Sequence, residues 1–458
     1  MARTVIRGGT VLTMEPGDAP QVADVLIEDD EIVAVEPDLG TVDANAIDAT
    51  GSLVLPGLVD THRHVWQSGM RGVTGDSVLK DYFRSIRFQA SPAYRPEDIA
   101  VGNLAGMLEA IDAGVTTVLD FCHAVVTPDH AHAAIDGTTE SGIRSQFALG
   151  YSDMPGRHPD LLTVEGLLGL TRQLRENRLH ADDALVTLGV ALSDLPEVGV
   201  ERITRELAGV REMGLRSTTN GLAILFHDPV DDLAVFEEAG LHGPDIVWVH
   251  LNYATHEQLK RLFDLGGHVA VCTEAEMALG MGRPVTERAI AAGGHCSFGC
   301  DVTTSVSGSL LNQARTAMQV GRLFGADEGM RAGRAPASVP PSAETMLRAA
   351  TLWGAEALAI DSRTGSLRAG KQADIIVVRG TDVNTAPVND PYATVISQAH
   401  PGNIDTVMVA GRVLKRDGRL VADWGSVRRR LEESRDYVTG VVEANGGFWP
   451  TPAIELPW

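Results

Sequence analysis

The sequence is poor in cysteine and has no long apolar run. Its four cysteines are too scattered for the disulfide framework of a secreted domain: Cys122, Cys272, Cys296 and Cys300. The spacing of the last two is explained more simply by small buried residues on one strand than by a metal site. No apolar segment reaches the roughly 18 residues that a membrane helix requires, and the first residues lack a secretory apolar region. These absences predict a cytoplasmic protein.

Basic residues are also scarce relative to acidic ones. Lysine and arginine total 38 against 61 aspartates and glutamates, which gives a formal net charge of -23 and a pI near 4.9. Such a charge argues against a nucleic acid or an anionic membrane as partner. Hydrophobic residues make up 44% and charged residues 22% of the 458 residues, as in soluble globular proteins. We therefore expect the ligand to be a small-molecule substrate.

Both ends of the chain carry short, alternating strand patterns. Near the N-terminus, Gly and Asp turns separate such runs at residues 4–6, 10–14, 24–28 and 31–35. Strand character returns at residues 365–378 and 404–414. We infer one composite β-sandwich formed by both chain ends, with a larger domain inserted between them. The expected boundaries are 1–56 and 362–424 for the sandwich, 57–361 for the inserted domain, and 425–458 for a C-terminal helix and tail.

The inserted segment alternates apolar strand-like runs with helical stretches. One predicted helix begins with Pro96, has acidic residues in its first turn and ends at Gly114; another is predicted over residues 342–360. Eight strand–helix units predict an α/β fold, a (β/α)8 TIM barrel, with a doubly wound sheet as the alternative. The eight runs are residues 58–64, 115–120, 144–150, 185–192, 215–220, 246–251, 268–272 and 296–301.

Polar side chains stand at the carboxyl ends of these runs, where chemistry sits in barrels of this kind. His62 and His64 are two residues apart on one strand, so both point the same way and form a ready pair of metal ligands. Together with further strand-end histidines and an aspartate, they predict a metal site at the mouth. The other strand-end residues are Asp120 with His123, Asn220, His250, Glu274 and Asp301.

Three stretches match a known pattern: Leu-Pro-Gly-Leu-Val-Asp-Thr-His-Arg-His at 55–64, the strand that ends in Asp301, and Gly-Lys-Gln-Ala-Asp at 370–374. With them, the chain resembles the amidohydrolase superfamily, in the branch of cytosine deaminase, 8-oxoguanine deaminase and the triazine chlorohydrolases. The resemblance implies Zn2+ or Fe2+ held by His62, His64, a strand-five histidine and Asp301. It also implies that His250 lies beside the metal-bound water or the substrate, and that the protein is a homo-oligomer.

The chain departs from this pattern at strand five. Asn220 stands where the resemblance implies histidine, and His227 further along is the alternative ligand. An amide oxygen is a poor replacement for an imidazole nitrogen on zinc, so His62, His64 and Asp301 would hold a metal more weakly, or the site would hold none. The carboxylate that many related deaminases carry shortly after the strand-five histidine is missing as well.

The remaining candidates have expected roles in a hydrolytic reaction. Asp301 accepts a proton from water, His250 and His123 stabilise developing charge, and Glu274 grips or protonates the substrate. Trp66, Gln67 and Asn220 are expected to bind substrate, and residues 69–94 are expected to form a lid.

The function expected first is metal-dependent hydrolysis, a deamination or similar C–N or C–X cleavage, of a small cyclic nitrogen-containing metabolite. One alternative is a metal-free lyase, isomerase or cyclising enzyme that uses the same histidines and carboxylates as acid–base groups. The second alternative is an inactive binding relative.

Overall fold

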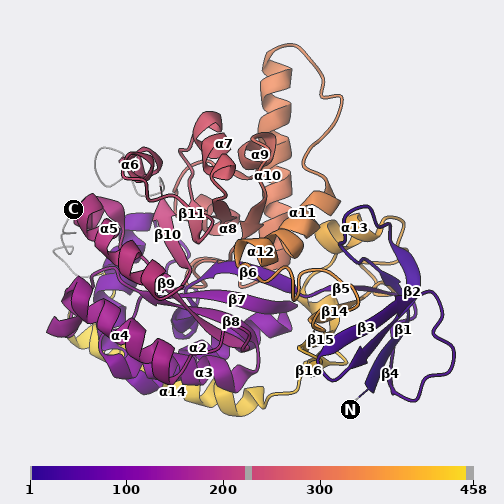
Figure 1. The fold of residues 1–458 in the computed structure, drawn as a ribbon, viewed down its shortest axis with the longest axis horizontal. Coiled ribbons are helices and arrows are strands. Elements are labelled where there is room, and N and C mark those ends of the chain that lie inside the picture. The colour runs from indigo at the N-terminus through magenta and orange to yellow at the C-terminus, as the bar shows by residue number, and fades with distance from the viewer. Residues whose placement is uncertain (1–2, 222–229, 450–458) are drawn as a thin grey trace.

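The computed structural model describes residues 3–221 and 230–449. Within these residues, one closed barrel and one separate sheet account for the strands. The barrel occupies the left and centre of Figure 1, and the sheet lies at the right, next to the N-terminus. No helix within the described ranges is long and apolar enough to cross a membrane.

The barrel strands fall within or next to the eight predicted runs. They are β6 (Leu58–Arg63), β7 (Val115–Cys122), β8 (Arg144–Gly150), β9 (Val186–Ala191), β10 (Ser217–Gly221), β11 (Ile246–His250), β12 (His268–Val271) and β13 (Cys296–Phe298). Neighbours pair in parallel, and β13 pairs with β6 to close the ring. The strands are buried almost throughout, as expected for strands covered on both faces. The predicted (β/α)8 barrel is therefore confirmed.

The separate sheet combines strands from both chain ends, as predicted. Its strands are β1 (Arg3–Val11), β2 (Gln21–Glu28), β3 (Glu31–Glu36), β4 (Asn45–Asp48), β5 (Ser52–Pro56), β14 (Ile375–Arg379), β15 (Ile404–Val409), β16 (Arg412–Arg416) and β17 (Arg419–Leu420). The two halves join where β5 pairs antiparallel with β14. The run predicted at 4–6 and the first two residues of the run predicted at 10–14 belong to the single strand β1, whose register shifts between Ile6 and Gly9. The expected domain boundaries stay a prediction.

A buried ion pair fixes this sheet to the barrel. The guanidinium of Arg144 on β8 donates to both carboxylate oxygens of Asp374, at 2.8 and 3.1 Å. Asp374 also accepts from the backbone N–H of Ala410 at 2.7 Å. Because a buried carboxylate needs such partners, the Gly-Lys-Gln-Ala-Asp stretch at 370–374 serves the architecture.

The helices cover the barrel from outside (Figure 1). They are α1 (Leu79–Tyr82), α2 (Pro96–Asp112), α3 (Pro128–Ser141), α4 (Val164–Asn177), α5 (Leu195–Glu212), α6 (Asp232–Glu238), α7 (His256–Asp264), α8 (Thr273–Ala278), α9 (Thr286–Ala291), α10 (Leu310–Arg331), α11 (Ala343–Ala349), α12 (Leu352–Ala357), α13 (Pro391–Ala393) and α14 (Trp424–Ala444). Segments of 3-10 or π-helical geometry are η1 (Val65–Met70), η2 (Phe83–Ala90), η3 (Ser91–Ala93), η4 (Pro159–Leu162), η5 (Thr394–Gln398) and η6 (Pro401–Asn403).

The helix predicted over 342–360 is two helices, α11 and α12. The backbone N–H of Val59 on β6 donates to Ala350 O at 2.8 Å. In a continuous helix that carbonyl would accept from the backbone four residues later. Thr351, between the two helices, has φ -132° and ψ -90°, which is not helical. The start of the first barrel strand therefore interrupts the predicted helix.

Candidate active site

The carboxyl ends of β6 and β13 are tied together by backbone hydrogen bonds. Asp301 N donates to His62 O at 2.9 Å, and His64 N donates to Asp301 O at 2.9 Å. Asp301 has φ 58° and His250, at the end of β11, has φ 72°. Left-handed backbone at non-glycine residues costs about 1–3 kcal/mol and clusters at functional sites. This rim of the barrel thus has the backbone expected of an active site.

The carboxylate of Asp301 lies beside two imidazoles. Its Oδ1 is 3.3 Å from Nε2 of His62 and 3.3 Å from Nε2 of His64. Burial alone would raise the pKa of Asp301, but its contacts with the two histidines hold that pKa well below the usual value. Burial lowers the pKa of His62 to about 4. At neutral pH an ionised carboxylate therefore faces a neutral His62 ring.

The donor atoms of this cluster fit a bound cation. His64 Nδ1 lies 2.8 Å from Phe121 O, which only accepts, so Nδ1 carries the proton and the neutral ring turns the Nε2 lone pair toward Asp301. Within residues 3–221 and 230–449, both ring nitrogens of His62 are buried without a hydrogen-bond partner. One ligand atom each of His62, His250 and Asp301 lie within 4.8 Å of one another. Imidazole nitrogens with one carboxylate suit Zn2+ or Fe2+.

His250 is oriented by a carboxylate that the sequence analysis did not identify. Its Nδ1 lies 3.1 Å from Oε1 of Glu276 on α8, and Glu276 also accepts from Cys272 N at 2.8 Å and from Asn252 Nδ2 at 3.0 Å. Burial lowers the pKa of His250, but the Glu276 hydrogen bond and the Asp301 charge outweigh it, so the net pKa is raised. Glu276 therefore keeps a proton on Nδ1 and leaves Nε2 for the site.

His123 is held as a neutral hydrogen-bond donor. Its ring stacks on His64, with centroids 4.0 Å apart and planes inclined by 5°. The indole Nε1 of Trp66 donates to His123 Nδ1 at 3.1 Å. Because an indole N–H only donates, the proton of the neutral His123 ring is on Nε2. Burial, with the nearby charge of Arg87, holds the pKa of His123 well below its usual value.

Asn220, at the predicted strand-five position on β10, has its amide fixed by an acidic neighbour. Asn220 Nδ2 donates to Asp194 Oδ1 at 3.0 Å, and Ser152 Oγ donates to the other Asp194 oxygen at 3.3 Å. The second amide atom, Asn220 Oδ1, is buried and has no hydrogen-bond partner among the described residues. Asn220 thus presents an oxygen acceptor where the resemblance implies an imidazole.

These side chains share one small cavity of about 40 Å3. Its lining includes five of the predicted site residues: His64, His123, Asn220, His250 and Asp301. The cavity is also lined from α1 and η2, within the segment predicted as a lid, by Leu79, Tyr82, Phe83 and Arg87. The segment predicted as a lid therefore forms part of the wall of this cavity.

Trp66 and Gln67 do not line this cavity but lie one layer behind it. Both are fully buried on η1, where the chain turns after His64 and stops alternating as a strand does. Trp66 contacts His123, and Gln67 Nε2 donates to the hydroxyl oxygen of Tyr82 at 2.7 Å. Their contacts therefore hold lining residues in place, and their predicted contact with substrate stays a prediction.

The structure does not bring Glu274 to the cavity. Its carboxylate faces α10 and accepts from Ser307 Oγ at 3.4 Å, Gln313 Nε2 at 3.3 Å and Thr316 Oγ1 at 3.4 Å. Glu276, two residues later on the same helical turn, contacts His250 instead. His227, the alternative strand-five ligand, lies outside the described residues.

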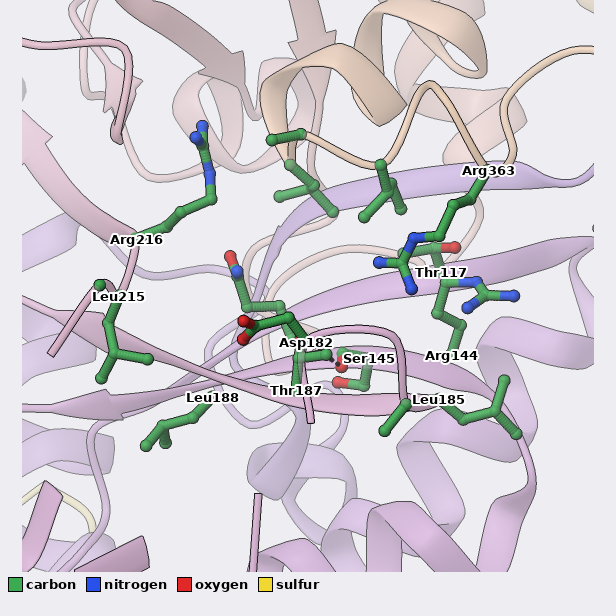
Figure 2. Close-up of a pocket in the computed structure, with 16 residues that line it drawn as sticks. Thr117, Arg144, Ser145, Asp182, Leu185, Thr187, Leu188, Leu215, Arg216 and Arg363 are labelled. Atoms are coloured by element: carbon green, nitrogen blue, oxygen red, sulfur yellow. Dashed lines mark hydrogen bonds between the residues drawn. The ribbon is translucent and has the colours of Figure 1, made fainter. Parts of the chain in front are cut away.

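A larger cavity, of about 150 Å3, lies near the amino ends of β8, β9 and β10 (Figure 2). Arg144 and Arg363 stand on one side of it in the view, and Arg216 stands on the other. Its lining contains no histidine and none of the predicted site residues. Chemistry in barrels of this type belongs to the carboxyl ends of the strands, so the smaller cavity is the candidate active site.

Three residues of the site escaped prediction: Glu276, Asp194 and Arg87. The first two are visible as carboxylates near strand ends, in the segments that follow β12 and β9. For Arg87, the sequence offered one indication, its position within the segment predicted as a lid. Spacing along the chain does not show which of several nearby polar residues turns toward a barrel mouth.

Comparison with known proteins agrees with the barrel fold. Residues 53–414 match the amidohydrolase family. A 5-methylthioadenosine/S-adenosylhomocysteine deaminase of Pyrococcus abyssi is 25% identical over 425 residues, covering 91% of this chain and 95% of the relative.

Two solved structures share the fold. An adenosine deaminase from Xanthomonas campestris with bound zinc has a TM-score of 0.84 at 22% identity, covering 95% of this chain and 98% of that one. Atrazine chlorohydrolase from Arthrobacter aurescens TC1, complexed with zinc, has a TM-score of 0.83 at 24% identity, covering 94% and 100%. The resemblance inferred from sequence is thereby confirmed, and the chain belongs to the amidohydrolase family.

Proposed function

We propose that this protein is a metal-dependent hydrolase that removes an amino group from a small nitrogen-containing ring compound. The observation that carries the proposal is the cluster around Asp301 Oδ1, with two imidazole nitrogens at 3.3 Å and a buried His62 ring that lacks hydrogen-bond partners. A buried carboxylate and three histidines are costly unless they serve a charge or a reaction. The family, and a relative named as a deaminase, support hydrolysis of a C–N bond.

The residues that would hold the ion are His62, His64 and Asp301, and Asn220 Oδ1 is an additional oxygen donor. We propose Zn2+ or Fe2+, because two imidazoles and a carboxylate suit either ion. The zinc found in both structural neighbours is consistent with this choice. When bound, such an ion supplies a Lewis acid and a water that ionises near neutral pH.

The chain's own side chains then move protons and orient the substrate. Asp301, held ionised, accepts the proton of the attacking water. His250, with Nδ1 satisfied by Glu276, uses Nε2 to stabilise charge that develops on the ring. His123 donates a hydrogen bond from Nε2 to a ring atom of the substrate. The proton that Asp301 took from water passes to the amino group, the C–N bond breaks, and ammonia leaves.

Asn220 supports one alternative reaction class. With an amide in place of a third imidazole, the site would bind metal weakly. A lyase, isomerase or cyclising enzyme could then use His62, His250 and Asp301 as acid–base groups without metal.

The scarcity of cysteine further supports a cytoplasmic location. The family resemblance supports a homo-oligomer, and size-exclusion chromatography with light scattering would test that oligomeric state.

The test combines metal content with ammonia release. Purified protein is assayed by inductively coupled plasma mass spectrometry without added metal, then with adenosine, 5'-deoxyadenosine, cytosine and 2-aminopyrimidine as substrates. We expect about one ion per chain and ammonia release from at least one ring compound. The matched variants are Asp301→Asn, which should lose both, and His295→Gln, an exposed residue near the opposite end that should lose neither.

Absence of metal, together with an unchanged melting temperature on zinc addition, would overturn the hydrolytic proposal and favour the metal-free reaction.

A further inference from the structure

One positively charged side chain in the cavity wall, Arg87, has no negatively charged partner among the described residues. Arg87 lies on η2, is 6% exposed, and lines the same cavity as His123, Asn220 and Asp301. In residues 3–221 and 230–449, no carboxylate comes within 4.0 Å of its guanidinium, and its Nε is buried without a hydrogen-bond partner. A buried, unpaired guanidinium destabilises the folded state unless something else binds it.

The other buried arginines of the described chain each donate hydrogen bonds to a carboxylate or to backbone carbonyls, which makes Arg87 the exception. Arg63 donates to Asp60 at 2.8 Å, and Arg144 donates to Asp374 at 2.8 Å. Arg157 donates to three backbone carbonyls, at 3.0 to 3.2 Å. By contrast, the ring contact of Arg87 is with Phe83, whose centroid is 5.7 Å away, near the outer limit for a cation–π interaction.

The acidic groups near Arg87 are already engaged or neutral. Asp194 accepts hydrogen bonds from Asn220 and Ser152. Burial and the neighbouring Asp194 raise the pKa of Glu197 to about 8, even though the charge of Arg87 acts to lower it. Glu197 is therefore largely protonated at pH 7. Neither group neutralises Arg87, although the protein as a whole carries a net charge of -23.

We propose that Arg87 binds a carboxylate carried by the substrate, so that the substrate is an anionic nitrogen heterocycle. A guanidinium offers two parallel N–H donors that match the two oxygens of a carboxylate. Arg87 lies on the lid segment, while Asp301 and the histidines lie on the barrel rim. The substrate is thus held by its acidic group on the lid side and attacked on the rim side. This inference rests on the proposed hydrolytic function and names its substrate class.

Isosteric ligands test the assignment without requiring turnover. Isothermal titration calorimetry of the full chain compares 6-carboxyuracil with 6-carboxamidouracil, which differ in charge but hardly in shape. We expect the carboxylate to bind at least tenfold more tightly, and Arg87→Gln to abolish that difference. Arg84→Gln, on the same helical segment but 30% exposed in its side chain, removes an equal charge and should retain the difference.

Arg87→Lys keeps the charge but loses the planar pair of donors, so an intermediate preference is expected. It also serves as the test if Arg87→Gln does not fold. Equal binding of acid and amide by the wild type, including binding of neither, would overturn the assignment.

The two proposals fail in different ways. In one outcome, neutral aminopyrimidines release ammonia, and neither a carboxylate on the ring nor Arg87→Gln changes the rate. That outcome would overturn the role of Arg87 and leave the deaminase proposal standing. A carboxylate preference that depends on Arg87, with no ammonia released from acidic or neutral rings, would overturn deamination and leave Arg87 as the anion-binding residue.

Discussion

Asp194 Oδ1 accepts a hydrogen bond of 3.0 Å from Asn220 Nδ2. A carboxylate can only accept, so this contact determines which way the amide of Asn220 points. Its oxygen, rather than its nitrogen, is left without a partner at the cavity. The residue that departs from the family pattern is therefore still oriented as a donor to a cation or an acceptor from substrate.

Replacing Asn220 with histidine should strengthen zinc binding. An imidazole nitrogen is a better zinc ligand than an amide oxygen, so Asn220→His is expected to lower the zinc Kd by about tenfold or more. The measurement is competition against a chromophoric zinc chelator. Asp194→Asn, which releases the Asn220 amide, should weaken binding by about tenfold. Unchanged affinity in both variants would place Asn220 outside the metal site.

Replacing Glu276 with glutamine should impair turnover far more than the same change at Glu274. Glu276→Gln keeps the shape but allows the amide to donate to His250 Nδ1, which moves the imidazole proton to the wrong nitrogen. We expect kcat to fall about 100-fold with little change in melting temperature. Glu274→Gln, whose carboxylate faces α10, should reduce kcat less than about threefold. The reverse order would restore the role that sequence reasoning gave to Glu274.

The two glutamates also show how far the sequence could be interpreted. Alternating runs and glycine-terminated helices were sufficient to predict all eight barrel strands and the sheet shared by both chain ends, because hydrophobic periodicity reflects burial directly. Glu274 and Glu276 lie two residues apart on α8, so they project about 200° apart around the helix axis. Which of them faces β11 depends on where the helix starts.

Trp66 and Gln67 lie behind the cavity wall for a similar reason. Strand β6, which carries His62, ends at Arg63, and the chain enters the short helix η1 directly after His64. On a strand, Trp66 and Gln67 would point to alternate faces. On η1, both side chains instead lie behind the cavity wall. Arg87 lies in a segment of π-helical geometry, for which no sequence period is diagnostic.

The stability of the protein should depend on pH through His268, at the start of β12. Burial and the charge of Arg216 lower the pKa of His268 to about 4, from 6.5. Below pH 6.5 the unfolded chain gains a proton that the folded chain does not, so stability is full above pH 6.5 and falls as the pH drops toward 4.

Between pH 7.5 and pH 5, the melting temperature of His268→Gln should therefore fall by about 2 °C less than that of the wild type. Differential scanning fluorimetry measures this difference. His256→Gln, at an exposed position on α7, should follow the wild type. If His268→Gln shows the same loss as the wild type, the pKa of His268 is not depressed in the folded protein.

Trp66→Phe should lower kcat through His123. The substitution removes the indole N–H that donates to His123 Nδ1 at 3.1 Å, so the ring is free to carry its proton on that nitrogen instead. Fewer molecules then present Nε2–H to the substrate. We expect kcat to fall about tenfold, which corresponds to the free energy of roughly one hydrogen bond. Trp248→Phe is the matched control, because Trp248 is equally buried but its indole nitrogen has no hydrogen-bond partner in the part of the chain that the structure describes. Both variants lose the same atoms from the core, and a comparable drop in melting temperature is expected, whereas kcat should change only in Trp66→Phe. Equal losses of kcat in the two variants would mean that Trp66 contributes packing alone and that the His123 tautomer does not limit the reaction.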